Sequence, residues 1–304
     1  MPAAQPSDRI RLAHGSAEAE VAPAGGGCLT AFRWHSGGGT IDWLRPATPR
    51  GGFPPNAAAC FPLVPYSNRI RDRRFHFAGR EQHVAANFGT SPHSIHGHGW
   101  QRPWQVTAQD ARSVTLAYRH DGSDWPQPYR AEQRVALNGD GALAVSLAVT
   151  NEGGGPMPAG LGLHPYFPRT PRCRLTAAVK AMWATDAEVM PTALVAPPQG
   201  ANPAAGLRPA EVALDNGFTG FAGRAVIDWP ERAASLTLEA DAALAFLVVY
   251  TPAGADFFCA EPVSHCTDAV NLAACRDDTG LRVLAPGETF AAGARFRPRL
   301  EAGA

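Results

Sequence analysis

Hydrophobic and polar residues alternate with a period of two over many short segments of this chain. The alternation is clearest at residues 106–109, 113–119, 129–137 and 142–150. Successive side chains of a strand point to opposite faces, so this period predicts strands with one buried face. Asn138-Gly139-Asp140-Gly141, between the last two segments, is typical of a hairpin turn. The pattern therefore predicts antiparallel pairs of strands.

Other short apolar segments, separated by glycine and proline, extend this prediction to most of the chain. Strands are expected at 10–12, 17–21, 28–34, 60–65, 73–77, 161–167, 225–229, 235–240, 244–250, 257–261 and 289–297, with further short strands within 171–212. Residues 46–55 and 196–203 are expected to be loops, 214–220 a turn, and 268–275 a single short turn of helix. No repeat or linker divides the sequence. We therefore expect one all-β domain over residues 1–304, with a core of about 10–298, folded as a large antiparallel β-sandwich.

Composition and charge narrow the possible partners. The chain has 27 basic and 27 acidic residues, so no net charge attracts nucleic acid or an anionic membrane. No apolar run approaches the ~20 residues of a membrane span, and residues 1–11 lack the pattern of a signal peptide. The six cysteines form no CxxC pair and are expected to be free thiols. These features predict a cytoplasmic location, without nucleic-acid or membrane partners.

Four stretches place polar groups inside apolar, turn-rich surroundings. They are 67–70, 94–100, 161–167 with His164, and 259–262 with Glu261. A histidine has an unperturbed pKa of ~6.5 and exchanges a proton near neutral pH. A lone histidine in a strand is more often a core residue bonded to a backbone carbonyl. The recurrence of such stretches favours a shared site instead.

The four stretches resemble motifs of the aldose 1-epimerase (galactose mutarotase) family. The resemblance covers most of the chain and lies in the order of several motifs, each weak alone. The matching stretches are Asn68-Arg69-Ile70, Ile95-His96-Gly97, His164-Pro165-Tyr166-Phe167, Asp186 with Met190-Pro191-Thr192, Leu214-Asp215-Asn216-Gly217-Phe218, Cys259-Ala260-Glu261 with Asp268-Ala269-Val270-Asn271, and Pro286-Gly287-Glu288. Three departures stand out: His96-Gly97-His98-Gly99 replaces Leu-His-Gly-Gly, Glu261-Pro262-Val263 replaces Glu-Thr-Gln, and Pro168-Arg169 replaces Asn-Leu.

The resemblance implies a galactose mutarotase-like supersandwich that interconverts the α and β anomers of a hexose. It assigns Glu261 as the base and His164 as the acid. It also implies that Arg69, His96, Asp215 and Asn68 bind the substrate. Opening a sugar ring needs a base for the C1 hydroxyl and an acid for the ring oxygen, and general acid–base catalysis is typically worth ~10²–10⁴-fold. A histidine beside a carboxylate is expected to be held in its charged, proton-donating form.

The residues themselves are compatible with plainer roles. Arg69 could be a solvated arginine, His96 a loop histidine, Asp215 a turn residue and Asn68 structural. Aromatic side chains can stack on a pyranose, although in a β-protein they more often pack in the core. The aromatic candidates for stacking are Trp100, Trp104 and Tyr166.

Three alternatives to a free-sugar mutarotase remain open. Arg71, Arg73 and Arg74 could suit a hexose 6-phosphate. The same fold could bind carbohydrate without turnover. His96-x-His98 could hold a metal if both side chains faced the same way. The favoured hypothesis requires no metal and no cofactor, and leaves a monomer and a homodimer equally open.

Overall fold

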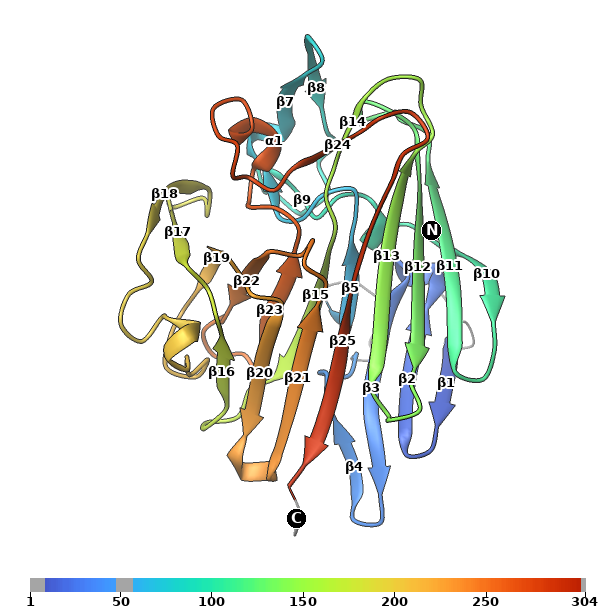
Figure 1. Ribbon diagram of the computed structural model, residues 1–304, viewed down its shortest axis with the longest axis vertical. Helices are drawn as coiled ribbons and strands as arrows, with labels where there is room; N and C mark the ends of the chain where they lie inside the picture. Colours follow the sequence, from blue (N-terminus) through green and yellow to red (C-terminus); the bar gives the residue numbers. More distant parts are fainter. Residues whose placement is uncertain (1–8, 48–56, 302–304) are drawn as a thin grey trace.

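The computed structural model describes residues 9–47 and 57–301. Two antiparallel sheets, a large one of 11 strands and a small one of 8 strands, pack face to face within these residues (Figure 1). The large sheet runs in the order β1 (Ile10–His14), β2 (Ala17–Ala22), β3 (Cys28–Ser36), β5 (Cys60–Leu63), β15 (Gly162–Pro168), β23 (Phe257–Val263), β22 (Phe246–Tyr250), β19 (Asp215–Thr219), β17 (Ala181–Thr185) and β18 (Pro191–Val195), with β4 (Gly39–Asp42) paired to β3.

The small sheet covers one face of the large one. Its order is β10 (Gln105–Gln109), β11 (Ser113–His120), β12 (Tyr129–Leu137), β13 (Leu143–Asn151), β25 (Thr289–Leu300), β21 (Ala234–Ala240), β20 (Arg224–Trp229) and β16 (Arg174–Ala177). Short pairs lie outside both sheets: β6 (Arg69–Ile70) with β9 (Ser94–Ile95), β7 (Arg74–Phe77) with β8 (Arg80–His83), and β14 (Met157–Ala159) with β24 (Arg282–Leu284). The short helix α1 (Ala269–Leu272) lies near the β7–β8 hairpin (Figure 1).

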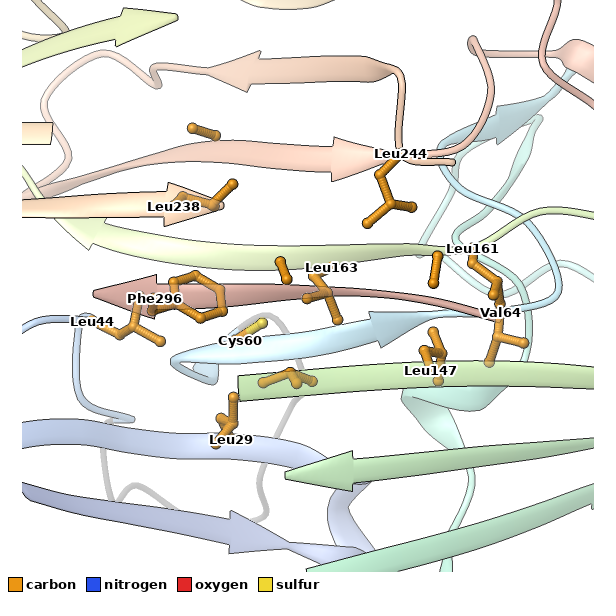
Figure 2. Close-up of a cluster of buried hydrophobic side chains, with 14 of the residues drawn as sticks. Leu29, Leu44, Cys60, Val64, Leu147, Leu161, Leu163, Leu238, Leu244 and Phe296 are labelled. Atoms are coloured by element: carbon orange, nitrogen blue, oxygen red, sulfur yellow. The ribbon is translucent and has the colours of Figure 1, made fainter. Parts of the chain in front are cut away.

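The hydrophobic core fills the space between the two sheets. Figure 2 shows Leu163 of β15 near Phe296 of β25, with Leu147 and Leu238 in the same cluster. These side chains are at most 2% exposed. Full burial of such a side chain stabilises the fold by about 1.5–3 kcal/mol. The period-two pattern of the sequence is thus explained by one strand face in this core.

The central strands of the large sheet are buried on both faces. On β23, Phe258 and Ala260 belong to the core between the sheets, whereas Cys259 and Val263 belong to a second cluster on the opposite face. Glu261 shares this second face because its side chain lies two residues from each of them. The second face is where a site can be built on a rigid sheet.

The structure confirms the all-β antiparallel sandwich and the short helical turn, which is α1. The predicted turn at 214–220 is wrong, because Asp215–Thr219 forms β19. Asp, Asn and Gly are poor strand formers, but these three residues of β19 pair with β22, and this pairing overrides local propensity. Most of the expected loop at 46–55 lies outside the described residues. Among those described, no helix has the length and apolar character needed to cross a bilayer.

Candidate functional site

A pocket of about 220 Å³ lies on the second face of the large sheet, beside β6 and β9. It gathers all six residues that the sequence singled out for catalysis or substrate binding, from five separate segments. The polar lining residues are Asn68, Arg69, His96, His164, Asp215 and Glu261, and the other lining residues are Phe61, Phe88, Ile95, Trp100, Tyr166, Tyr250 and Phe257. Arg71, Arg73 and Arg74 do not line it within the described part of the chain.

Strand register brings His164 and Glu261 together although 97 positions separate them. The β15–β23 ladder pairs Gly162 with Val263 and Tyr166 with Cys259, so the same register sets His164 opposite Glu261. Side chains directly opposite on one face of an antiparallel pair are close neighbours. His164 Nε2 lies 3.3 Å from Glu261 Oε1. The pair is therefore fixed by two central strands rather than by a loop.

Both members of this pair are almost completely buried. His164 is 6% exposed and Glu261 is 2% exposed. Burial raises the pKa of Glu261 well above its usual value, and Asp215 adds to this effect. Burial also lowers the pKa of His164 to about 3. The expectation that the neighbouring carboxylate would hold His164 charged is therefore not met, because the cost of desolvating the imidazolium is the larger effect.

Two polar atoms of the pair remain without a hydrogen-bond partner among the described residues. They are His164 Nδ1 and Glu261 Oε2. A buried polar atom left unpaired costs about 1–3 kcal/mol. Unpaired buried polar atoms are exceptional in folded proteins, and a catalytic role is one recognised reason for them.

Asn68 fixes the position of Arg69. The Asn68 Oδ1 atom accepts hydrogen bonds from the Arg69 backbone N–H at 2.9 Å and from Arg69 Nη1 at 3.1 Å. The Arg69 Nη2 atom donates to Asp215 Oδ2 at 3.1 Å, which joins β6 to β19. The structural role considered for Asn68 is therefore present, and the guanidinium fork is held at the pocket wall with its charge balanced by Asp215.

The tautomer of His96 follows from its backbone partner. The Asn68 backbone N–H donates to His96 Nδ1 at 3.1 Å, so Nδ1 carries no proton. Burial, together with His164 and Arg69, lowers the pKa of His96 well below its usual value. His96 is therefore a neutral imidazole that presents Nε2–H as a hydrogen-bond donor.

Gly97 lets the His96 segment pack tightly against the end of β5. Its φ is +71°, and a Cβ atom placed there would lie 2.2 Å from the Val64 carbonyl oxygen. That oxygen accepts from the backbone N–H groups of His98 at 3.0 Å and Gly99 at 3.2 Å. Only glycine permits this conformation and this close approach.

Replacing Gly97 by alanine should destabilise the protein by about 1–3 kcal/mol and displace His96. The free energy of unfolding, measured with urea, tests this prediction. Gly15→Ala is a matched control, because Gly15 has φ +57° but a Cβ there would meet no atom within 4 Å. Equal losses in the two variants would mean that the contact with Val64 carries no cost.

His98 points away from the pocket that His96 lines. Its Nδ1 lies 2.8 Å from the hydroxyl of Tyr129, and its ring stacks on His120 at a centroid distance of 4.1 Å. Asp124 Oδ1 lies 3.3 Å from His98 Nε2 and 2.9 Å from His120 Nε2. The hypothesis of a metal shared by His96 and His98 is therefore wrong. His98, His120 and Asp124 are close enough to share an ion, but two stacked imidazoles cannot both direct an in-plane lone pair at it.

A second group of possible metal ligands lies in the pocket itself. His164, Cys259 and Glu261 each place a ligand atom within 4.8 Å of the others. Burial raises the pKa of the Cys259 thiol well above its usual value. Metals bind the thiolate, so an ion here would have to displace a proton that burial holds on the thiol. The chemistry of this group favours proton transfer between His164 and Glu261.

Aromatic rings form much of the pocket wall, and the sequence identified only some of them. Trp100 and Tyr166 line the pocket, as expected of stacking candidates. Trp104 lies instead in the core between the sheets. The lining residues that sequence reasoning missed are Phe61, Phe88, Ile95, Tyr250 and Phe257. The alternation of side chains along a strand could have indicated Phe257, because it lies four residues before Glu261 and so on the same face of β23.

Comparisons with known proteins identify the family and the fold of this chain. The sequence pattern of the aldose 1-epimerase family matches residues 8–297. YphB of Escherichia coli K12, an uncharacterized protein, is 35% identical over an alignment of 294 positions that covers 91% of this chain and 94% of YphB. A solved E. coli K12 protein provisionally called an aldose 1-epimerase has a TM-score of 0.87 and 30% identity, covering 96% of this chain and 99% of its own.

A galactose mutarotase-like protein from Clostridium acetobutylicum shares the fold. Its TM-score is 0.85 at 20% identity, and the match covers 96% of this chain and 95% of that one. The resemblance drawn from the ordered motifs is therefore confirmed. With the family pattern matched over nearly the whole length, this chain belongs to the aldose 1-epimerase family.

Proposed function

We propose that this protein is a mutarotase that interconverts the α and β anomers of a free aldohexose. The observation that carries the proposal is the buried pair of His164 and Glu261, 3.3 Å apart in one pocket. The ring oxygen and the C1 hydroxyl oxygen of an aldose are bonded to the same carbon. An acid and a base must therefore lie within a few ångströms of each other, and this pair does.

In the resting pocket burial favours the neutral pair, and one proton transfer from Glu261 to His164 across their 3.3 Å contact gives the charged pair. Ring opening begins from this charged pair, with Glu261 ionised and His164 protonated. The carboxylate takes the proton of the C1 hydroxyl, and the imidazolium gives its proton to the ring oxygen. The bond between C1 and the ring oxygen breaks, and C1 becomes the carbonyl carbon of the open-chain aldehyde. Both residues are then neutral, which is the form that burial favours for each.

Ring closure reverses these transfers. Rotation about the C1–C2 bond first presents the other face of the carbonyl to the hydroxyl oxygen on C5. The neutral Glu261 then returns a proton to the carbonyl oxygen, and the neutral His164 accepts the proton of the C5 hydroxyl. The pair holds the same number of protons before and after turnover, so no other reactant is consumed.

The remaining polar residues supply contacts for hydroxyl groups. The Nε2–H of His96 is a donor, and the Asp215 carboxylate is an acceptor. The Arg69 guanidinium carries further N–H groups beside those bonded to Asn68 and Asp215. Donors and acceptors held on three different segments would fix the ring while its anomeric carbon reacts.

The direct test follows the equilibration of freshly dissolved α-glucose and α-galactose by polarimetry or proton NMR. The proposal predicts a rate above that of the buffer for at least one of these sugars, in proportion to enzyme concentration. Saturable binding of the sugars without faster equilibration would instead indicate a carbohydrate-binding protein.

Glucose 6-phosphate should be a poorer substrate than glucose, with kcat/KM lower by about tenfold or more. Arg69 is the one cationic side chain lining the pocket among the described residues, and Asp215 already neutralises it. A phosphate dianion that entered the pocket would lose its hydration shell and would find no unpaired cationic side chain, among the described lining residues, to compensate for that loss. Steady-state kinetics with the two sugars at one pH test this, and faster turnover of the phosphorylated sugar would reverse the choice of substrate.

A further inference from the structure

Phe88 is a large aromatic side chain that stays exposed beside the pocket. It is 45% exposed, whereas Trp100 next to it is 3% exposed. The two ring centroids are 6.4 Å apart. The other large hydrophobic residues exposed within the described ranges are valines, at 106, 195 and 283. An exposed aromatic ring among the residues that line a pocket is the kind of apolar surface that contacts a ligand.

The backbone around Phe88 is fixed, although residues 84–93 contain no strand. The Asn87 side chain donates to the carbonyls of Ile95 at 2.7 Å and Gly97 at 3.1 Å, and accepts from the Ile95 N–H at 2.8 Å. The Asn87 carbonyl accepts from Gln101 Nε2 at 2.7 Å. The exposure of Phe88 therefore results from a specific placement, because its neighbour is tied on both sides to the segment that carries His96.

We infer that Phe88 is a substrate-binding residue that stacks its ring on the apolar C–H face of the sugar, next to Trp100. This inference rests on the proposed function. The polar lining residues supply hydrogen bonds to the hydroxyl groups of the sugar. An aromatic surface covers the face of the pyranose that carries only C–H groups and makes no hydrogen bonds. Covering that face would also bury the exposed part of the Phe88 ring.

Kinetics of Phe88→Ala against wild type test the inference. The expected result is a rise in KM of about tenfold with kcat unchanged within about twofold, because the reacting atoms contact His164 and Glu261. Phe88→Tyr should keep the wild-type KM, since it retains the ring. Val283→Ala, which removes another exposed side chain (53% exposed), is the matched control. A fall in kcat alone, or an unchanged KM, would overturn the inference.

Binding of 1,5-anhydroglucitol separates this inference from the proposed function. This sugar has no C1 hydroxyl and cannot anomerise, so its Kd, measured by calorimetry, reports binding alone. A Kd about tenfold weaker in Phe88→Ala supports the stacking role, even if wild type anomerises no sugar. Equal Kd values in both proteins, or no binding to either, would refute the stacking role whatever the activity.

Discussion

Replacing Glu261 by glutamine is expected to lower kcat/KM for anomerisation by about 10²–10⁴-fold, the usual contribution of a general base. Glutamine keeps the size of the side chain and its place on β23 but cannot take the proton of the C1 hydroxyl. The measurement is the rate of anomer equilibration, followed by polarimetry, for wild type and Glu261→Gln with the sugar that wild type converts fastest. Glu211→Gln, at a side chain 59% exposed, is the control and should keep full activity.

The stability of Glu261→Gln separates loss of chemistry from loss of fold. Burial raises the pKa of Glu261 in the folded state, so the folded protein binds this proton more tightly than the unfolded chain. The ionised carboxylate therefore costs stability increasingly as the pH rises above the unfolded value. Glutamine carries no such cost, so the Tm of the variant at pH 8 should equal or exceed that of wild type. An inactive variant with a much lower Tm would point to misfolding instead.

Replacing His164 by asparagine should lower kcat by about 10²–10⁴-fold, because no general acid would then protonate the ring oxygen as its bond to C1 breaks. KM should change by only a few-fold, since Arg69, His96 and Asp215 still contact the hydroxyls in the proposed arrangement. Initial rates over a range of sugar concentrations separate the two constants. His83→Asn, at a side chain 70% exposed, is the matched control.

The double variant Glu261→Gln/His164→Asn tests whether the two residues act in one step. Groups that act together in one transition state lose most of their effect with the first substitution. The double variant should therefore be about as slow as the slower single variant. Losses that multiply would show that the residues act independently, which contradicts the paired mechanism.

The sequence by itself determined the strand pattern and the residues of the candidate site. Period-two alternation is a local property, so segments such as 129–137 could be assigned without tertiary information. The ordered motifs around Arg69, His96, His164 and Glu261 indicated the family, which the comparison over residues 8–297 confirmed. Local propensity failed at Asp215, where pairing with Tyr250 of β22 makes a strand from turn-forming residues.

Only the tertiary structure decided how these residues meet and which protons they hold. The 3.3 Å contact between His164 and Glu261 depends on the register of two strands far apart in sequence. Their opposite pKa shifts arise from burial, which no local pattern reports. The spacing of His96 and His98 left open a metal held by both side chains, but the bend at Gly97 sends them to different parts of the protein. Sequence specifies the chemical groups of this site, whereas long-range packing sets their distances and charges.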